Sequence, residues 1–430
     1  MKIAWFTPFS VKSAIGKYSK LATDALSKYA VVDIFLFEKE NLLQTKLKTI
    51  YCAEIGNLIN KLTEYDMVVY NMGDNTPYHQ CIYEVLQIKK GTIIIHDATL
   101  LGFYYGYYCN YKNMFDDFKN LYESLYNDPA ENAPSRYLSN DGIDYGFMEH
   151  ITRFCRGIIV HSDFHENIVK KVYNGPLTRI YFPFSQEYIS VKSQDCKVDK
   201  DTAKIRMLTV GNINKNKKVL EVVKAIGQSN LLKNVYKYYI VGSLGEYEYI
   251  NQIETIIERY NIQDNIELIG YVDDETLSTY YRDADVLCNL RNPALEGASW
   301  SLVEQMSLGK PIIVSDNGFY SEIPKDCVFK ISIENETVEL IELLTLIANN
   351  HDMLKQKGHN AKNFIDLKFN QEQYAQNFML FAEHIQFSKP IDLFMDKLSI
   401  ALNQLGITKG MKIVDTISEQ MQLMFNKIEK

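Results

Sequence analysis

The sequence lacks three features that would each point to a particular class of protein. Its seven cysteines are an odd number and form no C-x-x-C pair, so neither a disulfide framework nor a structural zinc site is expected. The net charge of -8 gives no basic excess, which argues against a nucleic-acid partner. No apolar run approaches the roughly 18 residues of a membrane-spanning helix. These absences favour a cytoplasmic protein that would meet a membrane only peripherally.

Short apolar runs alternate with helical stretches through most of the chain. A length of 430 residues predicts two domains, because one hydrophobic core rarely serves so long a chain. Buried parallel strands, covered by helices on both faces, read as short continuous apolar runs. A helix is expected at 13–29, and residues 103–145 break the rhythm and suggest an insertion or lid. The strand candidates of the first half are 2–7, 31–37, 67–70, 92–96, 157–161 and 178–184.

A polar, charged stretch at 185–204 suggests an interdomain linker, after which the alternation resumes. The strand candidates of the second half are 206–210, 236–241, 265–268, 286–290, 311–314 and 328–331. The predicted fold class is therefore α/β, with two doubly wound Rossmann-like domains facing a cleft and a C-terminal helical extension. We place the first domain at 1–190, the second at 191–370 and a C-terminal helical region at 371–430.

The C-terminal region contains helix candidates at 371–386 and beyond Pro390. The last carries an apolar stripe formed by Ile413, Ile417, Met421, Met424 and Ile428. Packing against the body of the protein explains such a stripe, and association with a second copy or a partner helix is the alternative.

Two carboxylates eight positions apart give the strongest functional signal, in Glu296-Gly-Ala-Ser-Trp-Ser-Leu-Val-Glu304. A strand is expected to end near Leu290 and a helix to begin near Ser299, so Glu296 lies in a loop and Glu304 about one turn into the helix. Free amides at the helix start can face an anion, and carboxylates accept hydrogen bonds from sugar hydroxyls. The spacing alone is equally compatible with two solvated acids.

Followed by Gly309-Lys310-Pro311 and a strand, this segment resembles the E-x7-E motif of retaining glycosyltransferases of family 4, which have the GT-B fold. The resemblance is best over 205–325, moderate over 1–185 and absent over 390–430. It implies that 1–190 binds the acceptor, that 191–370 binds the nucleotide-sugar, and that the helices of 371–430 first cross back to the N-terminal domain. In this reading Glu296 contacts the donor sugar and Glu304 the nucleotide ribose. It also implies that the donor diphosphate lies against the helix start, which contains Gly297, Ala298 and Ser299.

The loop Val210-Gly-Asn-Ile-Asn-Lys-Asn-Lys-Lys218 resembles the diphosphate-binding loop of that family. A fixed ammonium there would stabilise the negative charge of a departing diphosphate. Lys217 falls on the position of the family's lysine. Asn212, directly after Gly211, stands where arginine is common in the family, and Lys218 stands where glycine is common. Lys215 or Lys218 could supply the missing cation. A solvated lysine run is the alternative.

The strand candidate 92–96 ends in His96 and is followed by Asp97. Relatives often carry a histidine that contacts the donor sugar at the position of His96, although an isolated histidine there is more often structural. Asp97 either orients the imidazole or caps the loop. The resemblance further suggests that Ser13, Gly16 and Gly73 lie on the acceptor side and that Tyr271 packs near the base. Tight packing of a strand on a helix explains Gly16 nearly as well.

Other readings remain open. Asp283-Ala-Asp285 is formally a D-x-D, but it precedes a buried strand, so no metal site is predicted. The expected activity is the transfer of a hexosyl group with retention of configuration, without a metal or a cofactor. The donor would be a nucleotide diphosphate-sugar, either GDP-mannose or a UDP-sugar. The acceptor would be a hydroxyl group of a glycan, a lipid or a protein glycan. The alternatives are a non-catalytic sugar-nucleotide binder or scaffold that acts through its C-terminal helices, and a nucleotide-sugar epimerase.

Overall fold

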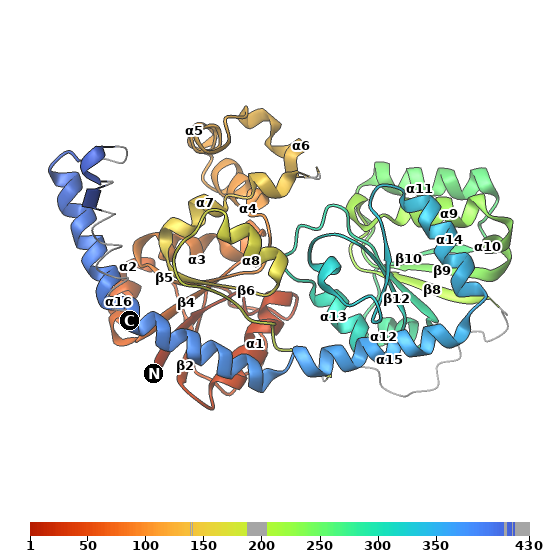
Figure 1. The fold of residues 1–430 in the computed structure, drawn as a ribbon, viewed down its shortest axis with the longest axis horizontal. Coiled ribbons are helices and arrows are strands. Elements are labelled where there is room, and N and C mark those ends of the chain that lie inside the picture. The colour runs from red at the N-terminus through yellow and green to blue at the C-terminus, as the bar shows by residue number, and fades with distance from the viewer. Residues whose placement is uncertain (138, 140, 187–203, 408–410, 415, 418–430) are drawn as a thin grey trace. The chain divides into compact units, whose positions relative to one another are not determined.

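The computed structural model describes residues 1–137, 139, 141–186, 204–407, 411–414 and 416–417 (Figure 1). The chain divides into two compact units, Met1–Met379 and Leu380–Lys430. The larger unit contains two parallel sheets flanked by helices, which confirms the predicted fold class. Most of the predicted linker, 187–203, lies outside the described residues, as do Met421, Met424 and Ile428 of the C-terminal stripe.

The first sheet has seven strands in the order β3-β2-β1-β4-β5-β6-β7, and every neighbouring pair is parallel. Its central strands are buried on both faces, which explains why they read as continuous apolar runs. The strands are β1 Lys2–Phe6, β2 Val31–Leu36, β3 Thr49–Tyr51, β4 Met67–Met72, β5 Gly91–Ile95, β6 Cys155–Val160 and β7 Leu177–Arg179.

Eight α-helices accompany these strands in the described part of the first half. They are α1 Ala14–Leu26, α2 Ile55–Lys61, α3 Thr76–Ile88, α4 Leu101–Tyr105, α5 Phe115–Tyr126, α6 Ala133–Tyr137, α7 Met148–Ile151 and α8 Asp163–Lys170. Short 3-10 or π turns lie between them at Leu62–Glu64, Gly106–Tyr111, Ala130–Asn132, Gly142–Tyr145 and Thr152–Phe154.

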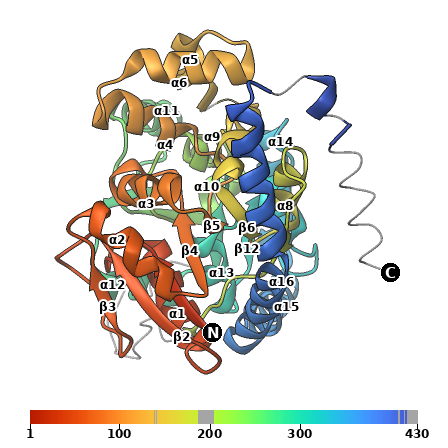
Figure 2. The same cartoon turned by 90° about the vertical axis from the view of Figure 1, so that its left-hand side faces the viewer.

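The stretch predicted to be an insertion or lid, 103–145, is largely helical. Its aromatic rings extend the core of the first sheet, and those of Tyr104 and Phe147 stack at 4.5 Å and those of Phe118 and Tyr122 at 5.6 Å. Figures 1 and 2 show α5 and α6 set off from the helices that flank the sheet. Aromatic packing therefore organises this insertion between β5 and β6.

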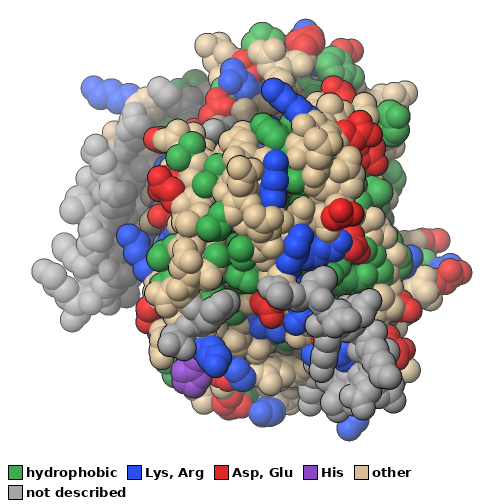
Figure 3. Space-filling view, turned by 90° about the vertical axis from the view of Figure 1, so that its right-hand side faces the viewer, with side chains coloured by type: hydrophobic (Ala, Val, Ile, Leu, Met, Phe, Trp, Pro, Cys, Tyr) green, Lys and Arg blue, Asp and Glu red, His purple; other side chains and the backbone are tan. Residues whose placement is uncertain are grey.

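The second sheet has six parallel strands in the order β10-β9-β8-β11-β12-β13. They are β8 Ile205–Val210, β9 Tyr236–Val241, β10 Ile266–Gly270, β11 Val286–Asn289, β12 Ile312–Ser315 and β13 Phe329–Ile331. The helices of this half are α9 Val219–Gln228, α10 Asn230–Val235, α11 Tyr247–Tyr260, α12 Asp274–Asp283, α13 Trp300–Ser307, α14 Glu336–Ala348 and α15 His351–Lys368, with short turns at Lys215–Lys217 and Gly318–Glu322. On the face of this half drawn in Figure 3, basic and acidic side chains are interspersed.

The last long helix, α16, runs from Gln371 to Gln404, whereas one helix was expected at 371–386 and further helices from Pro390 onward. Proline at an interior helix position removes one hydrogen bond, and here the helix continues through it. The start of α16 packs on the first sheet, because the Tyr374 hydroxyl lies 2.5 Å from that of Tyr18 and the Phe378 ring 5.7 Å from that of Trp5. None of the described helices is long and apolar enough to cross a bilayer.

Candidate functional site

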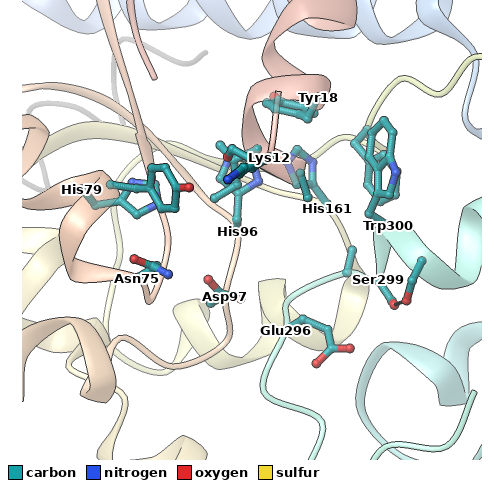
Figure 4. A pocket seen from close by; sticks show the side chains of 17 residues that line it. Lys12, Tyr18, Asn75, His79, His96, Asp97, His161, Glu296, Ser299 and Trp300 are labelled. Carbon is teal, nitrogen blue, oxygen red and sulfur yellow. Dashed lines mark hydrogen bonds between the residues drawn. The ribbon is translucent and has the colours of Figure 1, made fainter. Parts of the chain in front are cut away.

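A cavity of about 470 Å³ lies where loops from the two sheets meet (Figure 4). The loop after β1, the loop after β5 and the loop that leads into α13 each contribute to its wall. From the residues predicted to form the site, it gathers Ser13, His96, Asp97, Glu296, Ala298 and Ser299. In each sheet, the loops that follow the parallel strands lie at the same edge. Residues from loops that are distant in sequence therefore lie close together in the cavity wall.

The loops after β5 and β11 are joined by their backbones. Asp97 and Glu296 form an antiparallel β-bridge. On either side of it, the Ala98 amide donates to the Leu295 carbonyl at 2.8 Å and the Gly297 amide donates to the His96 carbonyl at 2.9 Å. A Cβ at Gly297 would lie 2.1 Å from Nδ1 of His165, so only glycine fits at this contact. The junction thus places His96, Asp97 and Glu296 together in the cavity wall.

Two side chains hold the Glu296 carboxylate. The Tyr320 hydroxyl donates to Oε1 at 2.5 Å, and the Arg291 Nε lies 3.3 Å from the same oxygen. The side chain of Glu296 is 22% exposed and that of Arg291 is 10% exposed. A carboxylate oriented in this way keeps acceptor capacity for hydroxyl groups of a ligand in the cavity.

Glu304 lies on α13, one turn beyond the helix start, as the spacing predicts. Burial raises its pKa to about 7, with the Lys17 ammonium acting to lower it and the Asp274 carboxylate to raise it. Ser299 caps the helix by accepting a hydrogen bond from the Leu302 amide at 3.4 Å. Glu304 therefore ionises near neutral pH. It is not among the residues that line the cavity.

Lys217 is buried at the carboxyl end of β8, where its Nζ donates to the Val210 carbonyl at 2.6 Å. It folds over Gly211, which has a φ of +110° and whose Cβ would lie 2.8 Å from Nζ. Burial holds the pKa of Lys217 well below its usual range; the Arg291 guanidinium lowers it further and the Glu296 carboxylate raises it. An anion bound beside this amine would favour its charged form.

Neither lysine proposed as a second cation is free for that role in the described structure. Lys218 is paired with Glu336 at 3.4 Å, and the exposed Lys215 lies 3.8 Å from Glu246. Asn212 is exposed. Arg291, which the motif search missed, is the cation that adjoins both Lys217 and Glu296. The sequence feature that could have identified Arg291 is its position directly after the apolar run at 286–290.

His96 is half-buried directly after β5 and is oriented by Asn71. The amide of Asn71 donates to the Phe6 carbonyl at 2.9 Å, which turns its oxygen toward Nε2 of His96 at 3.0 Å. Nε2 is therefore the protonated nitrogen of a neutral ring, and Nδ1 is the acceptor. Burial, with a smaller effect of His161, holds the pKa of His96 well below its usual range.

Asp97 caps a loop, because its Oδ2 accepts the Asp74 amide at 2.7 Å. Of the two roles considered from sequence, this is the one that its described contacts fit. Burial raises the pKa of Asp97 to about 7, the Asp74 amide lowers it and the nearby Glu296 raises it. Gly73 packs tightly beside it, since a Cβ there would lie 2.8 Å from Ile15 and 3.0 Å from Asp97.

Capping, packing or exposure to solvent describes the remaining candidates. Ser13 caps α1 by accepting the Gly16 amide at 3.1 Å, and a Cβ on Gly16 would lie 2.9 Å from the Ser10 carbonyl oxygen, so tight packing accounts for this glycine. Tyr271 is 80% exposed. The D-x-D acids precede β11, at the opposite edge of the sheet from Glu296, and are paired with Arg282 at 3.1 Å and Arg206 at 3.3 Å.

Sequence reasoning also missed the aromatic part of the cavity wall. The Tyr18 ring lies 4.8 Å from that of His96 and 5.1 Å from that of His161. Trp300, the first residue of α13, stacks on Phe182 with ring centroids 5.5 Å apart. Figure 4 shows Tyr18, His161 and Trp300 around the same space. The helix that contains Tyr18 was predicted at 13–29, but the place of this ring in the cavity wall was not.

Comparisons with known proteins agree with this architecture. Residues 191–364 match the family described as "Glycosyl transferases group 1". An uncharacterized glycosyltransferase of Methanocaldococcus jannaschii is 27% identical over 242 residues, which are 56% of this chain and 58% of that protein. The alignment thus spans little more than half of this curated relative.

Solved structures extend the likeness to nearly the whole fold. A sucrose-phosphate synthase from Thermosynechococcus elongatus superposes with a TM-score of 0.60 and 15% identity over 90% of this chain and 99% of that one. HepE of Anabaena, solved with UDP and glucose, gives a TM-score of 0.57 and 13% identity over 89% of this chain and all of that one, 100%. The fold is GT-B, and the family match supports a GT-B glycosyltransferase.

Proposed function

We propose that this protein is a retaining, metal-independent glycosyltransferase of family 4 that moves a sugar from a nucleotide diphosphate-sugar to a hydroxyl group. The observation that carries the proposal is the placement of Glu296. It is held by Tyr320 and Arg291 in a cavity wall built by both sheets. The group 1 match over 191–364, which contains both glutamates, supports the same activity.

In the proposed complex, the donor spans the second sheet's loops. Glu304 accepts hydrogen bonds from the ribose, and Glu296 accepts them from hydroxyls of the sugar. The diphosphate lies against Lys217 and the start of α13, near Gly297, Ala298 and Ser299. The Gly297 amide already donates to the His96 carbonyl, so the amides of the helix start that follows would face the anion. HepE was solved with UDP and glucose, so a UDP-sugar is the first donor to test, with GDP-mannose as the second.

The acceptor oxygen would attack the anomeric carbon from the face that the diphosphate leaves. The bond between that carbon and the diphosphate oxygen breaks, its electron pair stays on the diphosphate, and the acceptor hydroxyl's proton passes to that oxygen. Lys217 would stabilise the developing charge. Neutral His96 can hydrogen-bond to the sugar without adding a positive charge near the reacting carbon.

The acceptor is proposed to be a hydroxyl of a glycan or glycoconjugate that enters beside Ser13, Gly73 and Asp97. Aromatic rings such as those of Tyr18 and Trp300 offer flat apolar surface to a sugar ring. A lipid-linked acceptor would require peripheral association with a membrane. Association of copies through the C-terminal helices remains part of the proposal.

Thermal shift tests the proposal directly, using wild type and Glu304→Ala with UDP-, GDP-, ADP- and dTDP-sugars, with and without EDTA. A donor at 100 times its dissociation constant should add about 2.7 kcal/mol to the stability. We expect one nucleotide to stabilise wild type regardless of EDTA, little effect in Glu304→Ala, and a wild-type response in the exposed control Glu342→Ala on α14. NMR of the transferred sugar then reports its anomeric configuration. No response to any donor would favour the non-catalytic scaffold.

A further inference from the structure

Two cations meet at the carboxyl edge of the second sheet. β8 and β11 are neighbouring parallel strands, so the loops that follow them are adjacent. Lys217 binds the carbonyl of Val210 at the end of β8, and Arg291 lies two residues beyond the end of β11 at Asn289. The two loops are joined one residue from each cation, because the Asn292 amide donates to the Asn216 carbonyl at 2.8 Å.

Arg291 is fixed in this position from several sides. Its backbone amide donates to the Ser315 hydroxyl at 3.1 Å, and its Nη1 donates to the Leu290 carbonyl at 2.8 Å. Its Nε faces Glu296 at 3.3 Å. These described contacts use two of the five guanidinium N–H donors, so the planar group is oriented and still has donors for a ligand.

Lys217 and Arg291 have one carboxylate between them in the described structure. Lys218 and Lys215 have their own acidic partners, Glu336 and Glu246. Among described side chains, the carboxylate that adjoins both Lys217 and Arg291 is that of Glu296. Burial and the Arg291 guanidinium lower the pKa of Lys217, so an anion beside both groups would favour the charged amine and offset the repulsion between the two cations.

We propose that Arg291 is a ligand of the donor diphosphate and supplies the second cation that Asn212 does not. The inference deepens the proposed function and rests on it. A guanidinium binds two phosphate oxygens side by side, whereas an ammonium acts as a point charge. Arg291 would thus hold the diphosphate while its Nε keeps Glu296 oriented toward the sugar, so one side chain would connect the leaving group to the sugar-binding carboxylate.

Discrimination between nucleoside diphosphate and monophosphate tests this role. Binding of UDP and UMP, GDP and GMP, ADP and AMP, and dTDP and dTMP is measured by calorimetry for wild type, Arg291→Gln, Arg291→Lys and the exposed control Arg259→Gln on α11. Loss of a charged hydrogen-bonding group predicts about a 10- to 100-fold weaker affinity of Arg291→Gln for the bound diphosphate. The affinity for the matching monophosphate should change less than about threefold, Arg291→Lys should be intermediate, and the control should match wild type.

The outcomes separate the two levels of the proposal. If wild type prefers the diphosphate and Arg291→Gln keeps that preference while turnover falls, Arg291 only positions Glu296, and the inference is wrong although the proposed function stands. Equal weakening of diphosphate and monophosphate would also overturn it. If wild type binds none of these nucleotides, the proposed function fails and the inference with it. A thermal unfolding curve for each variant shows whether it is folded, and Arg291→Lys, which keeps the charge, decides the matter should Arg291→Gln not fold.

Discussion

Donor binding should become tighter as Glu304 ionises. A ribose diol donates hydrogen bonds, so it prefers the carboxylate to the carboxylic acid. With a pKa of about 7, Glu304 is about one-tenth ionised at pH 6 and about nine-tenths ionised at pH 8. If only the ionised form binds, the affinity rises about tenfold over this range. The stability of the unliganded protein should change with pH in the opposite direction. Because the pKa of Glu304 is raised in the folded state, its contribution to the unfolding free energy falls as pH rises from 4.5 toward 7.

Calorimetric titration with an intact nucleotide-sugar at pH 6, 7 and 8 measures this effect. The intact donor is preferable to the free nucleotide, whose terminal phosphate titrates in the same range. Glu304→Gln is the matched variant, because it keeps the shape and cannot ionise. It should bind with an affinity that changes less than about threefold with pH.

Asp97 and Asp74 also have raised pKa values, of about 7 and about 8, and both are retained in Glu304→Gln. The difference between the two titrations therefore isolates Glu304. An identical pH dependence in wild type and Glu304→Gln would refute a carboxylate contact to the donor at this position.

Three further results are expected. Lys217→Met should lower kcat by about 10²- to 10³-fold, as measured by product release, because a preorganised cation for the leaving group is lost; an unchanged kcat would remove Lys217 from the mechanism. Gly297→Ala should reduce the unfolding free energy by about 1–3 kcal/mol in a denaturant titration, since its Cβ would lie 2.1 Å from His165, whereas Gly56→Ala, with nothing within 4 Å, should show no such loss. Burial lowers the pKa of His161 to about 4, so stability should fall by up to about 3 kcal/mol as pH drops from 6.5 to 4; His161→Gln should flatten that slope in thermal scans at stepped pH.

The repeating part of the fold was predictable from the sequence, and its exceptions have physical causes. Buried strands are continuous apolar runs, so both sheets could be found by this criterion. β3 was not predicted, because it has only three residues and is mostly exposed. The helices α4–α6 were not predicted because the stretch is rich in Tyr, Asn and Asp and interrupts the alternation of apolar runs, although α5 carries Phe118, Tyr122 and Tyr126 at helical spacing.

The candidate site was only partly predictable. Motif spacing placed Glu296 in a loop and Glu304 on a helix, which the structure reproduces. The partners of Glu296 were not predicted, because Tyr320 and Arg291 approach it through strand adjacency and loop folding, which spacing does not encode. The orientation of His96 by Asn71 likewise depends on the pairing of β4 with β5. The donor-side roles of these residues stay predictions.

The junction at Asp97 and Glu296 affects how such a protein can change over evolutionary time. Its hydrogen bonds join backbone amides and carbonyls, so most side-chain substitutions on either loop leave them intact. The two halves can therefore accumulate different sequences, and exchange one substrate preference for another, while the walls of the cavity stay in register. Glycine at 297 is the exception, because the close approach of His165 leaves no room for a side chain there. Recombination between distant homologues would be limited by the backbone geometry of this junction more than by the identity of the residues around it.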